Sequence, residues 1–294
     1  MLETLKSRIP HSLKQRIPRS LKNGIQTSAL FRFFYVKRQA EVDNIYHCCT
    51  HKSASQWVKG LLFDMETYRY SGLTGFQYQK AWMPNGKDSR PYNERRFSRA
   101  FPRRRICGPL YFHYECFEAL EKPENHRAFF VMRDPRDLAV SYYFSMKHSH
   151  GNIGEGLRKR LDALSREEGL CWSIDTLHNM GALEAQRSWV RDGAQNSNVR
   201  IFRYEDLVGG DQFQHLRELF DFCTIPMPDE ALADLIDRYA FQKLAGGRSK
   251  GTGDRKHHYR KGVAGDWRNH FDEQVESHFR EVTEDLIEVL GYAW

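Results

Sequence analysis

The sequence lacks the features that mark several large classes of protein. Its 294 residues include only six cysteines, and no two are spaced as CxxC, so we expect neither a zinc site nor a disulfide scaffold. It contains no run of 18 apolar residues, and therefore no segment is predicted to cross a membrane as a helix. The short apolar stretch at 29–36 is not followed by small residues typical of a signal-peptide cleavage site. These absences predict a cytoplasmic protein with reduced thiols.

The body of the chain also lacks an excess of charge of either sign. The net charge is +7, yet residues 1–40 alone hold nine Lys or Arg and one acidic residue, Glu3. This basic arm repeats an eight-residue pattern that begins at Leu5, Leu13 and Leu21. The arm is open to three interpretations: a disordered tail, a segment that contacts an anionic membrane or another polyanion, and a targeting peptide. We expect it to precede one folded domain at 41–294.

Short apolar runs alternate with helical patterns in that domain. Strands are predicted at 44–49, 128–132 and 198–203, and a helical pattern of apolar residues follows each of them. Strands that alternate with helices predict an α/β fold, a parallel sheet covered by helices on both faces. Ligands of such sheets bind at the carboxyl ends of the strands, and polar residues follow these three strands, after Cys49, Met132 and Arg203.

The first cluster is Thr50–Trp57, which reads THKSASQW between a strand and a helix. Main-chain N–H groups at the start of a helix bind anions, and Lys52 adds a full positive charge. The flanking glycines of the nucleotide-binding GxxxxGK[ST] loop are missing. A simple helix cap at Ser53 or Ser55 is the alternative interpretation.

Two further clusters are also suited to phosphate. Arg133 ends a strand and Ser141 lies two helical turns later; an arginine fork with a nearby hydroxyl suits a phosphate group, although an Arg–Asp capping network is the alternative. The third cluster, at 259–268, holds Arg260 and Lys261 before two glycines and a tryptophan. It predicts a loop that closes over an anion or, alternatively, a solvated basic turn.

Together the segments HKSASQW, RDPRDLAVSYY and RKGVAGDWR resemble the PKSGTTW, RxPxDxxxSxY and RKGxxGDWK motifs of the cytosolic-type sulfotransferases. Those enzymes use 3′-phosphoadenosine 5′-phosphosulfate (PAPS) and release 3′-phosphoadenosine 5′-phosphate (PAP). The resemblance covers 44–271 and is sparse between 67 and 127. It implies a single α/β domain with a P-loop-like central parallel sheet flanked by helices, PAPS as co-substrate, and no metal.

The resemblance also implies roles for individual residues. Lys52 would contact the bridging oxygen of the phosphosulfate and act in catalysis. Three further groups of residues are implied in nucleotide binding. The 5′-phosphate would be bound by Ser53, Ala54, Ser55, Gln56 and Trp57. The 3′-phosphate would be bound by Arg133, Ser141, Arg260, Lys261 and Gly262, and the adenine would contact Trp57, Tyr204 and Phe241.

The sequence departs from the family pattern at the catalytic base. The family carries a histidine in a KTHLP segment, whereas this chain has Gly108 near the expected place. His113 is our first candidate for the base, because imidazole titrates near neutrality, with a structural histidine as the alternative. Glu115 is the second candidate. His148 and His150 would instead line the acceptor cleft.

The acceptor is left open by the sequence. A hydroxyl or amine on a small molecule or glycan is expected, and no nucleic-acid partner. Aromatic residues in 68–82 and 111–117 would suit an apolar acceptor, and the arginines in 95–105 would suit an acidic glycan or peptide. Two alternatives to a sulfotransferase are a non-catalytic nucleotide- or polyanion-binding protein on the same fold, and a P-loop-type nucleotide kinase, against which the missing GK[ST] counts. The oligomeric state is not predicted.

Overall fold

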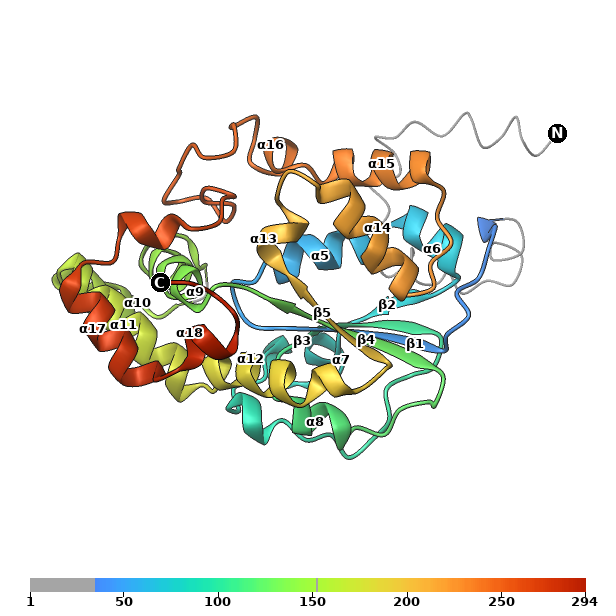
Figure 1. Cartoon of the computed structure of the whole chain (residues 1–294), viewed down its shortest axis with the longest axis horizontal. Coiled ribbons are helices and arrows are strands. Elements are labelled where there is room, and N and C mark those ends of the chain that lie inside the picture. Colours follow the sequence, from blue (N-terminus) through green and yellow to red (C-terminus); the bar gives the residue numbers. More distant parts are fainter. Residues whose placement is uncertain (1–34, 152) are drawn as a thin grey trace.

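The computed structural model describes residues 35–151 and 153–294, and a five-stranded parallel sheet lies at its centre (Figure 1). The strands are β1 (Asn44–Cys49), β2 (Thr74–Phe76), β3 (Arg105–Leu110), β4 (His126–Met132) and β5 (Val199–Arg203). They are ordered β2-β3-β1-β4-β5, and every pairing is parallel. All six residues of the central strand β1 are buried, as expected for a parallel sheet with both faces covered, where strands are apolar along their whole length.

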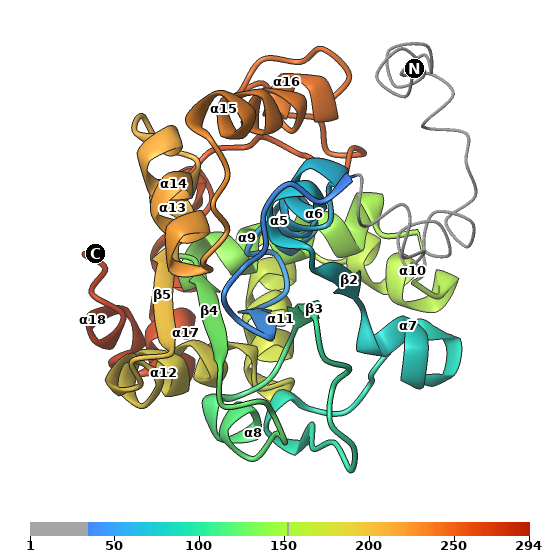
Figure 2. The ribbon, with the colours of Figure 1, turned by 90° about the vertical axis from the view of Figure 1, so that its right-hand side faces the viewer.

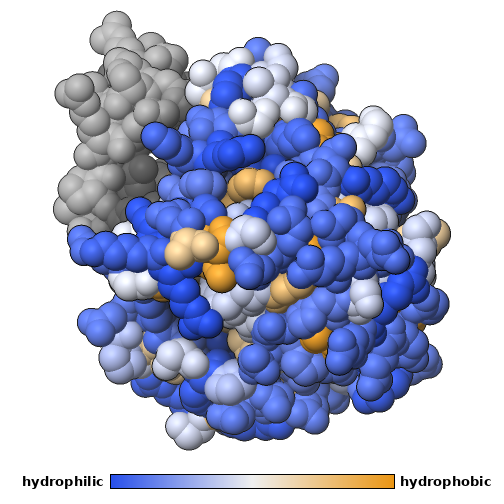
Figure 3. Space-filling view, turned by 90° about the vertical axis from the view of Figure 1, so that its left-hand side faces the viewer, coloured by the Kyte–Doolittle hydropathy of each residue, from blue (hydrophilic) through white to orange (hydrophobic). Residues whose placement is uncertain are grey.

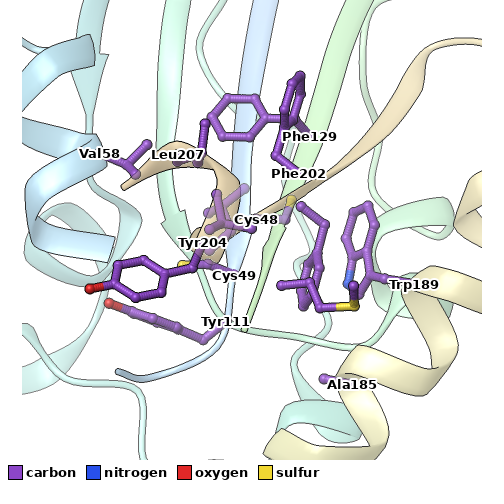
Figure 4. Close-up of a cluster of buried hydrophobic side chains, with 14 of the residues drawn as sticks. Cys48, Cys49, Val58, Tyr111, Phe129, Ala185, Trp189, Phe202, Tyr204 and Leu207 are labelled. Atoms are coloured by element: carbon purple, nitrogen blue, oxygen red, sulfur yellow. The ribbon is translucent and has the colours of Figure 1, made fainter. Parts of the chain in front are cut away.

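Helices pack on both faces of this sheet (Figures 1 and 2). The helices on one face are α5 (Ser55–Leu62), α6 (Met65–Ser71), α14 (Gln212–Phe222) and α15 (Asp229–Arg238), and those on the other include α8 (Tyr114–Glu118) and α12 (Ala182–Arg191). Figure 4 shows buried side chains from both layers: Val58 and Phe129 lie on one side of the strands and Trp189 on the other. Trp189 stacks on Phe130 with ring centroids 5.1 Å apart. The predicted α/β fold with a flanked parallel sheet is confirmed.

A further group of helices lies beside the carboxyl ends of the strands. It comprises α9 (Pro135–Phe144), α10 (Glu155–Ala163), α11 (Arg166–Asn179), α17 (Glu273–Thr283) and α18 (Leu286–Val289). The shorter elements are α7 (Tyr78–Trp82), α13 (Tyr204–Leu207), α16 (Phe241–Leu244), a π-helical turn at Ser145–Ser149, and 3₁₀ turns at Pro84–Gly86, Tyr92–Glu94, Gly193–Gln195 and Asp266–Asn269. The face in Figure 3, over the left-hand side of Figure 1, is largely hydrophilic with scattered apolar residues.

Two helical stretches of the chain are each divided in two. In the first, α5 ends at Leu62, and the Asp64 carboxylate accepts the main-chain N–H of Glu66 at 2.8 Å and caps a new helix, α6. In the second, α17 and α18 are separated at Glu284, whose φ of 54° is incompatible with a right-handed helix.

The structure describes only part of the chain for which the sequence made predictions. The repeats of the basic arm fall within residues 1–34, outside the described residues. All six cysteines carry free thiols. None of the helices in the described ranges has the length and hydrophobicity needed to cross a membrane. Over the same ranges, no cluster of three or more His, Cys, Asp or Glu side chains has the arrangement of a metal site.

Candidate active site

A cavity of about 930 Å³ lies at the carboxyl ends of β1, β4 and β5 and brings the three polar clusters together. Twelve of the thirteen residues proposed from the sequence to bind the nucleotide line it: Lys52, Ala54, Ser55, Gln56, Trp57, Arg133, Ser141, Tyr204, Phe241, Arg260, Lys261 and Gly262. The exception is Ser53, whose buried hydroxyl donates to the carbonyl of Thr50 at 2.8 Å. Any contribution from Ser53 to binding is therefore through its main-chain N–H.

The loop between β1 and α5 has the geometry of an anion site. Lys52 and Ala54 both adopt left-handed backbone conformations, with φ of 70° and 60°. No hydrogen bond within the described part of the chain uses the main-chain N–H groups of Ser53, Ala54, Ser55 and Gln56, whereas the N–H of Trp57 donates to the carbonyl of Ala54 at 2.9 Å. Four consecutive N–H donors at a helix start favour binding of a phosphate.

The electrostatic setting of Lys52 favours an anionic ligand. Burial, followed by the positive charges of Arg133 and Arg260, lowers the pKa of the Lys52 ammonium to about 8. A bound anion would offset the repulsion among these three cations. Arg133 pairs with Asp137 at 3.5 Å and Arg260 with Asp266 at 2.6 Å, whereas no carboxylate in the described ranges pairs with Lys52. An unpaired cation of this kind favours a bound phosphate.

Two of the three guanidinium nitrogens of Arg133 donate hydrogen bonds to main-chain carbonyls. Its guanidinium donates to the carbonyls of Lys52 at 2.9 Å and Val263 at 3.4 Å, and lies 4.3 Å from the centre of the Tyr204 ring. Within the described ranges its buried Nε has no hydrogen-bond partner. Arg133 lines the cavity, so its positive charge is available to an anion bound there.

The acidic residues of the second cluster are structural. Asp134 caps α9 by accepting the main-chain N–H of Arg136 at 2.9 Å, and it pairs with the Arg136 guanidinium at 2.8 Å. Asp137 accepts the main-chain N–H groups of Gly265 at 2.8 Å and Trp267 at 2.9 Å. The capping network considered from the sequence is therefore present, and it coexists with Arg133 and Ser141 in the cavity wall.

The third cluster is anchored by Asp266, which is nearly inaccessible to solvent. Arg260 and Lys261 each donate to this carboxylate at 2.6 Å. Hydrogen bonds from His270 and from these two cations hold the pKa of Asp266 far below its ordinary value, against the effect of burial. The carboxylate stays ionised, and it fixes both cations at the cavity.

His113, the first candidate for the base, does not line the cavity. It stands at the start of α8, and its Nε2 lies 2.9 Å from the carbonyl of Gly181. Glu115 is exposed and pairs with Arg96 at 3.3 Å. Of the two further histidines considered, only His150 lines the cavity. A structural role, the alternative considered for His113, agrees with these contacts.

Two histidines in the cavity wall were missed by sequence reasoning. They are His51, directly before Lys52, and His258, directly before the third cluster. Burial and the charge of Lys52 are among the causes that lower the pKa of His51 to about 3 and of His258 to about 4. Their positions next to motif residues are the signal that could have identified them.

The aromatic residues expected to form an apolar acceptor pocket pack elsewhere. Phe76, Tyr78 and Trp82 of the first group contact one another and the rings of Phe97 and Phe101, in a cluster that does not line the cavity. Of the second group, only Tyr111 reaches the cavity. Arg95 is also buried, and it donates to the carbonyl of Tyr111 at 2.8 Å. This arginine is therefore part of the scaffold and is not available to a glycan.

The sulfotransferase domain family model matches residues 29–291. Sulfotransferase 6B1 of Danio rerio is 27% identical over 145 residues, which cover 49% of this chain and 46% of that protein. The chain therefore spans about half the length of this curated relative.

Two solved structures show the same fold. Mouse sulfotransferase SULT7A1 complexed with PAP aligns with a TM-score of 0.60 and 18% identity, over 90% of this chain and 91% of that chain. Retinol dehydratase in complex with retinol and PAP aligns with a TM-score of 0.51 and 17% identity, over 85% and 83% of the two chains. The family model covers most of the sequence and the three motif clusters meet in one cavity, so the chain belongs to the sulfotransferase domain family.

Proposed function

We propose that this protein transfers the sulfuryl group of PAPS to a hydroxyl or amine acceptor without a metal. The observation that carries the proposal is a set of donors at one cavity: the unused main-chain N–H groups of Ala54–Gln56, next to Lys52, and the guanidinium of Arg133. Two separate anion sites that face a common cavity suit a nucleotide with a phosphate at each end. SULT7A1 and retinol dehydratase were each solved with PAP, which agrees with this nucleotide.

The nucleotide is placed by matching its charges to these donors. The 5′-phosphosulfate accepts from the main-chain N–H groups of the loop after β1, and the 3′-phosphate from Arg133, Ser141, Arg260 and Lys261. The adenine lies among the aromatic lining residues Trp57, Tyr204 and Phe241. The indole Nε1 of Trp57 donates to the carbonyl of Tyr239 at 3.0 Å, which fixes its ring orientation.

In the transfer itself, the acceptor oxygen or nitrogen forms a bond to sulfur as the bond from sulfur to the bridging oxygen breaks. Negative charge develops on that oxygen, and PAP leaves with it. Lys52 stabilises this charge, because a fixed cation in a water-poor site lowers the energy of the developing anion. The acceptor's proton passes to a base that faces the cavity, and we assign this role to His150 in place of His113.

The acceptor that this cavity suits is hydrophilic. Besides the nucleotide contacts, the wall includes Ser149, His150 and His258, which carry hydrogen-bonding groups. A polar small molecule or a glycan can form hydrogen bonds with such side chains.

The proposal is tested with the full chain in two steps. Calorimetry should show binding of PAP and PAPS and much weaker binding of ATP. Transfer of ³⁵S from labelled PAPS to a panel of glycans, phenols and amines should then show turnover with polar acceptors. Failure to bind PAP would contradict the proposal.

A non-catalytic nucleotide-binding protein is the second candidate, favoured by Ala54 in place of the family's loop glycine and by the displaced histidine. Tight PAP binding without turnover on any acceptor would support it. Selective binding of ATP with phosphoryl transfer would instead support a nucleotide kinase.

A further inference from the structure

His51 is held in one orientation by two tyrosines. Its Nδ1 is hydrogen-bonded to the Tyr92 hydroxyl, and its ring is stacked on Tyr111 with centroids 4.3 Å apart and planes 5° from parallel. Tyr111 is itself fixed, because its hydroxyl donates to Ser55 Oγ at 2.9 Å. The imidazole therefore has no freedom to flip, and its two nitrogens have distinct surroundings.

The hydrogen bonds of Tyr92 determine which nitrogen of His51 carries the proton. The Tyr92 oxygen accepts the main-chain N–H of His51 at 3.1 Å. Burial raises the pKa of the Tyr92 phenol far above its ordinary value, so the phenol keeps its hydrogen and has to donate it. Among the described residues, the acceptor in reach of that hydrogen is Nδ1 of His51. A neutral imidazole that accepts at Nδ1 carries its hydrogen on Nε2.

The imidazole is neutral at physiological pH. Burial, then the positive charges of Arg95 and Lys52, lower the pKa of His51 to about 3. His51 lines the cavity, and no hydrogen bond joins its Nε2 to another described residue. The ring thus presents one N–H donor that is unused by the rest of the described protein, next to Lys52 in the sequence.

We infer that His51 is a neutral hydrogen-bond donor of the transfer site, which binds a non-bridging oxygen of the sulfuryl group through Nε2–H. This inference rests on the proposed function, which supplies the identity of the anion. The two neighbouring residues have different roles. Lys52 neutralises the bridging oxygen on the leaving phosphate, while His51 orients the sulfuryl oxygens and adds no net charge. A neutral imidazole donor neither loses its proton to the substrate nor competes with the acceptor's base.

The first test reads the tautomer directly and does not require turnover. Spectra of ¹⁵N-histidine-labelled full-length protein, recorded with and without PAP and assigned by comparison with His51→Gln, should show His51 neutral and protonated at Nε2 from pH 6 to pH 8. A neutral ring protonated at Nδ1, or a doubly protonated ring, would overturn the inference.

The second test separates the sulfuryl group from the nucleotide. PAP lacks the sulfuryl group, so His51→Ala should leave PAP affinity within about threefold of wild type while lowering kcat about 100-fold, the usual effect of removing one such donor. His51→Gln, whose amide can donate from nearly the same place, should recover most of the activity. If His51→Ala were as active as wild type, or if its loss of PAP affinity explained its whole loss of activity, His51 would not be a donor to the sulfuryl group.

Tyr92→Phe supplies the tautomer control, because it removes the donor that holds the hydrogen on Nε2 while keeping the buried ring. Its kcat should fall, by less than in His51→Ala, and the NMR signal should shift toward a mixture of tautomers. His278→Gln is the matched histidine control, since His278 pairs with Asp175 at 2.8 Å and does not line the cavity. If wild type binds no PAP, the proposed function fails, while the tautomer measurement still decides the state of His51.

Discussion

Gly262 lies directly against the ring of Phe241, so closely that a Cβ on Gly262 would stand 2.3 Å from Cδ2 of that ring. Gly262 also has a φ of +69°, a left-handed conformation that side chains disfavour. The two residues come from α16 and from the third cluster, and both line the cavity. Their contact joins the proposed adenine contact to the proposed 3′-phosphate contact, so one substitution should disturb both.

Gly262→Ala should therefore weaken PAP binding about tenfold or more. The left-handed backbone alone costs a non-glycine residue about 1–2 kcal/mol, and the Phe241 ring would have to move as well. Calorimetric titration with PAP measures the effect. Gly253→Ala is the matched control, because a Cβ there meets nothing within 4 Å, and its affinity should equal that of wild type. Equal affinities for all three proteins would show that the Gly262–Phe241 contact is not part of the nucleotide site.

Ala54→Gly should stabilise the protein by about 0.5–1 kcal/mol, because Ala54 holds a φ of 60° that glycine adopts without strain. The gain is smaller than the full cost of the left-handed conformation, since glycine has more freedom in the unfolded chain. Thermal denaturation measures it. Ala119→Gly, at an exposed right-handed position, should instead lower the melting temperature. A lower melting temperature for Ala54→Gly would contradict the strain at this loop.

The general base is tested by a pair of histidine variants. His150→Gln should lower kcat about 100-fold or more, the usual contribution of a positioned base, with PAP affinity unchanged. His113→Gln should retain activity near wild type, because its Nε2 is engaged with the carbonyl of Gly181 and does not face the cavity. The acid limb of the pH profile should lie below that of an ordinary histidine, because burial and Lys52 lower the pKa of His150. The opposite ranking of the two variants would restore His113 as the base.

The fold class and the proposed nucleotide half of the site could be predicted from the sequence, because they depend on local patterns. Apolar runs predicted β1, β4 and β5, but not the edge strand β2 or its neighbour β3. The first two clusters follow β1 and β4, and parallel strands bring such ends to one edge of the sheet, so Lys52 and Arg133 meet. Arg260 lies on a loop after α16, and only the family motif indicated that it joins them.

The acceptor half could not be predicted, because side-chain directions there are set by contacts between distant segments. His51 is oriented by Tyr92 and Tyr111, which lie between 67 and 127, where the family motifs are sparse. His113 is turned away from the cavity by the carbonyl of Gly181 in the segment before α12. Neither contact leaves a periodic or spaced signal in the sequence.

Nucleotide affinity should fall as the pH rises through about 8. In the free protein Lys52 has a pKa of about 8, lowered by burial, Arg133 and Arg260, and its cationic form, present below that pH, is the form that binds an anion. A bound phosphate favours the cation and raises this pKa, so binding above pH 8 takes up a proton, and affinity should drop by up to about tenfold per pH unit. Phosphate groups, whose second pKa is near 6, do not titrate in this range.

Calorimetry of PAP binding between pH 7 and pH 9.5, in buffers with different ionisation enthalpies, measures both the affinity and the proton uptake. The buried phenols of Tyr111 and Tyr204 do not contribute to the proton uptake in this pH range, because burial raises the pKa of each. Lys52→Met is the deciding control: it should bind PAP more weakly at pH 7, take up no proton, lose the dependence above pH 8, and show no transfer. A Lys52→Met protein with the same pH dependence as wild type would assign the titration to another group and remove Lys52 from the phosphate site.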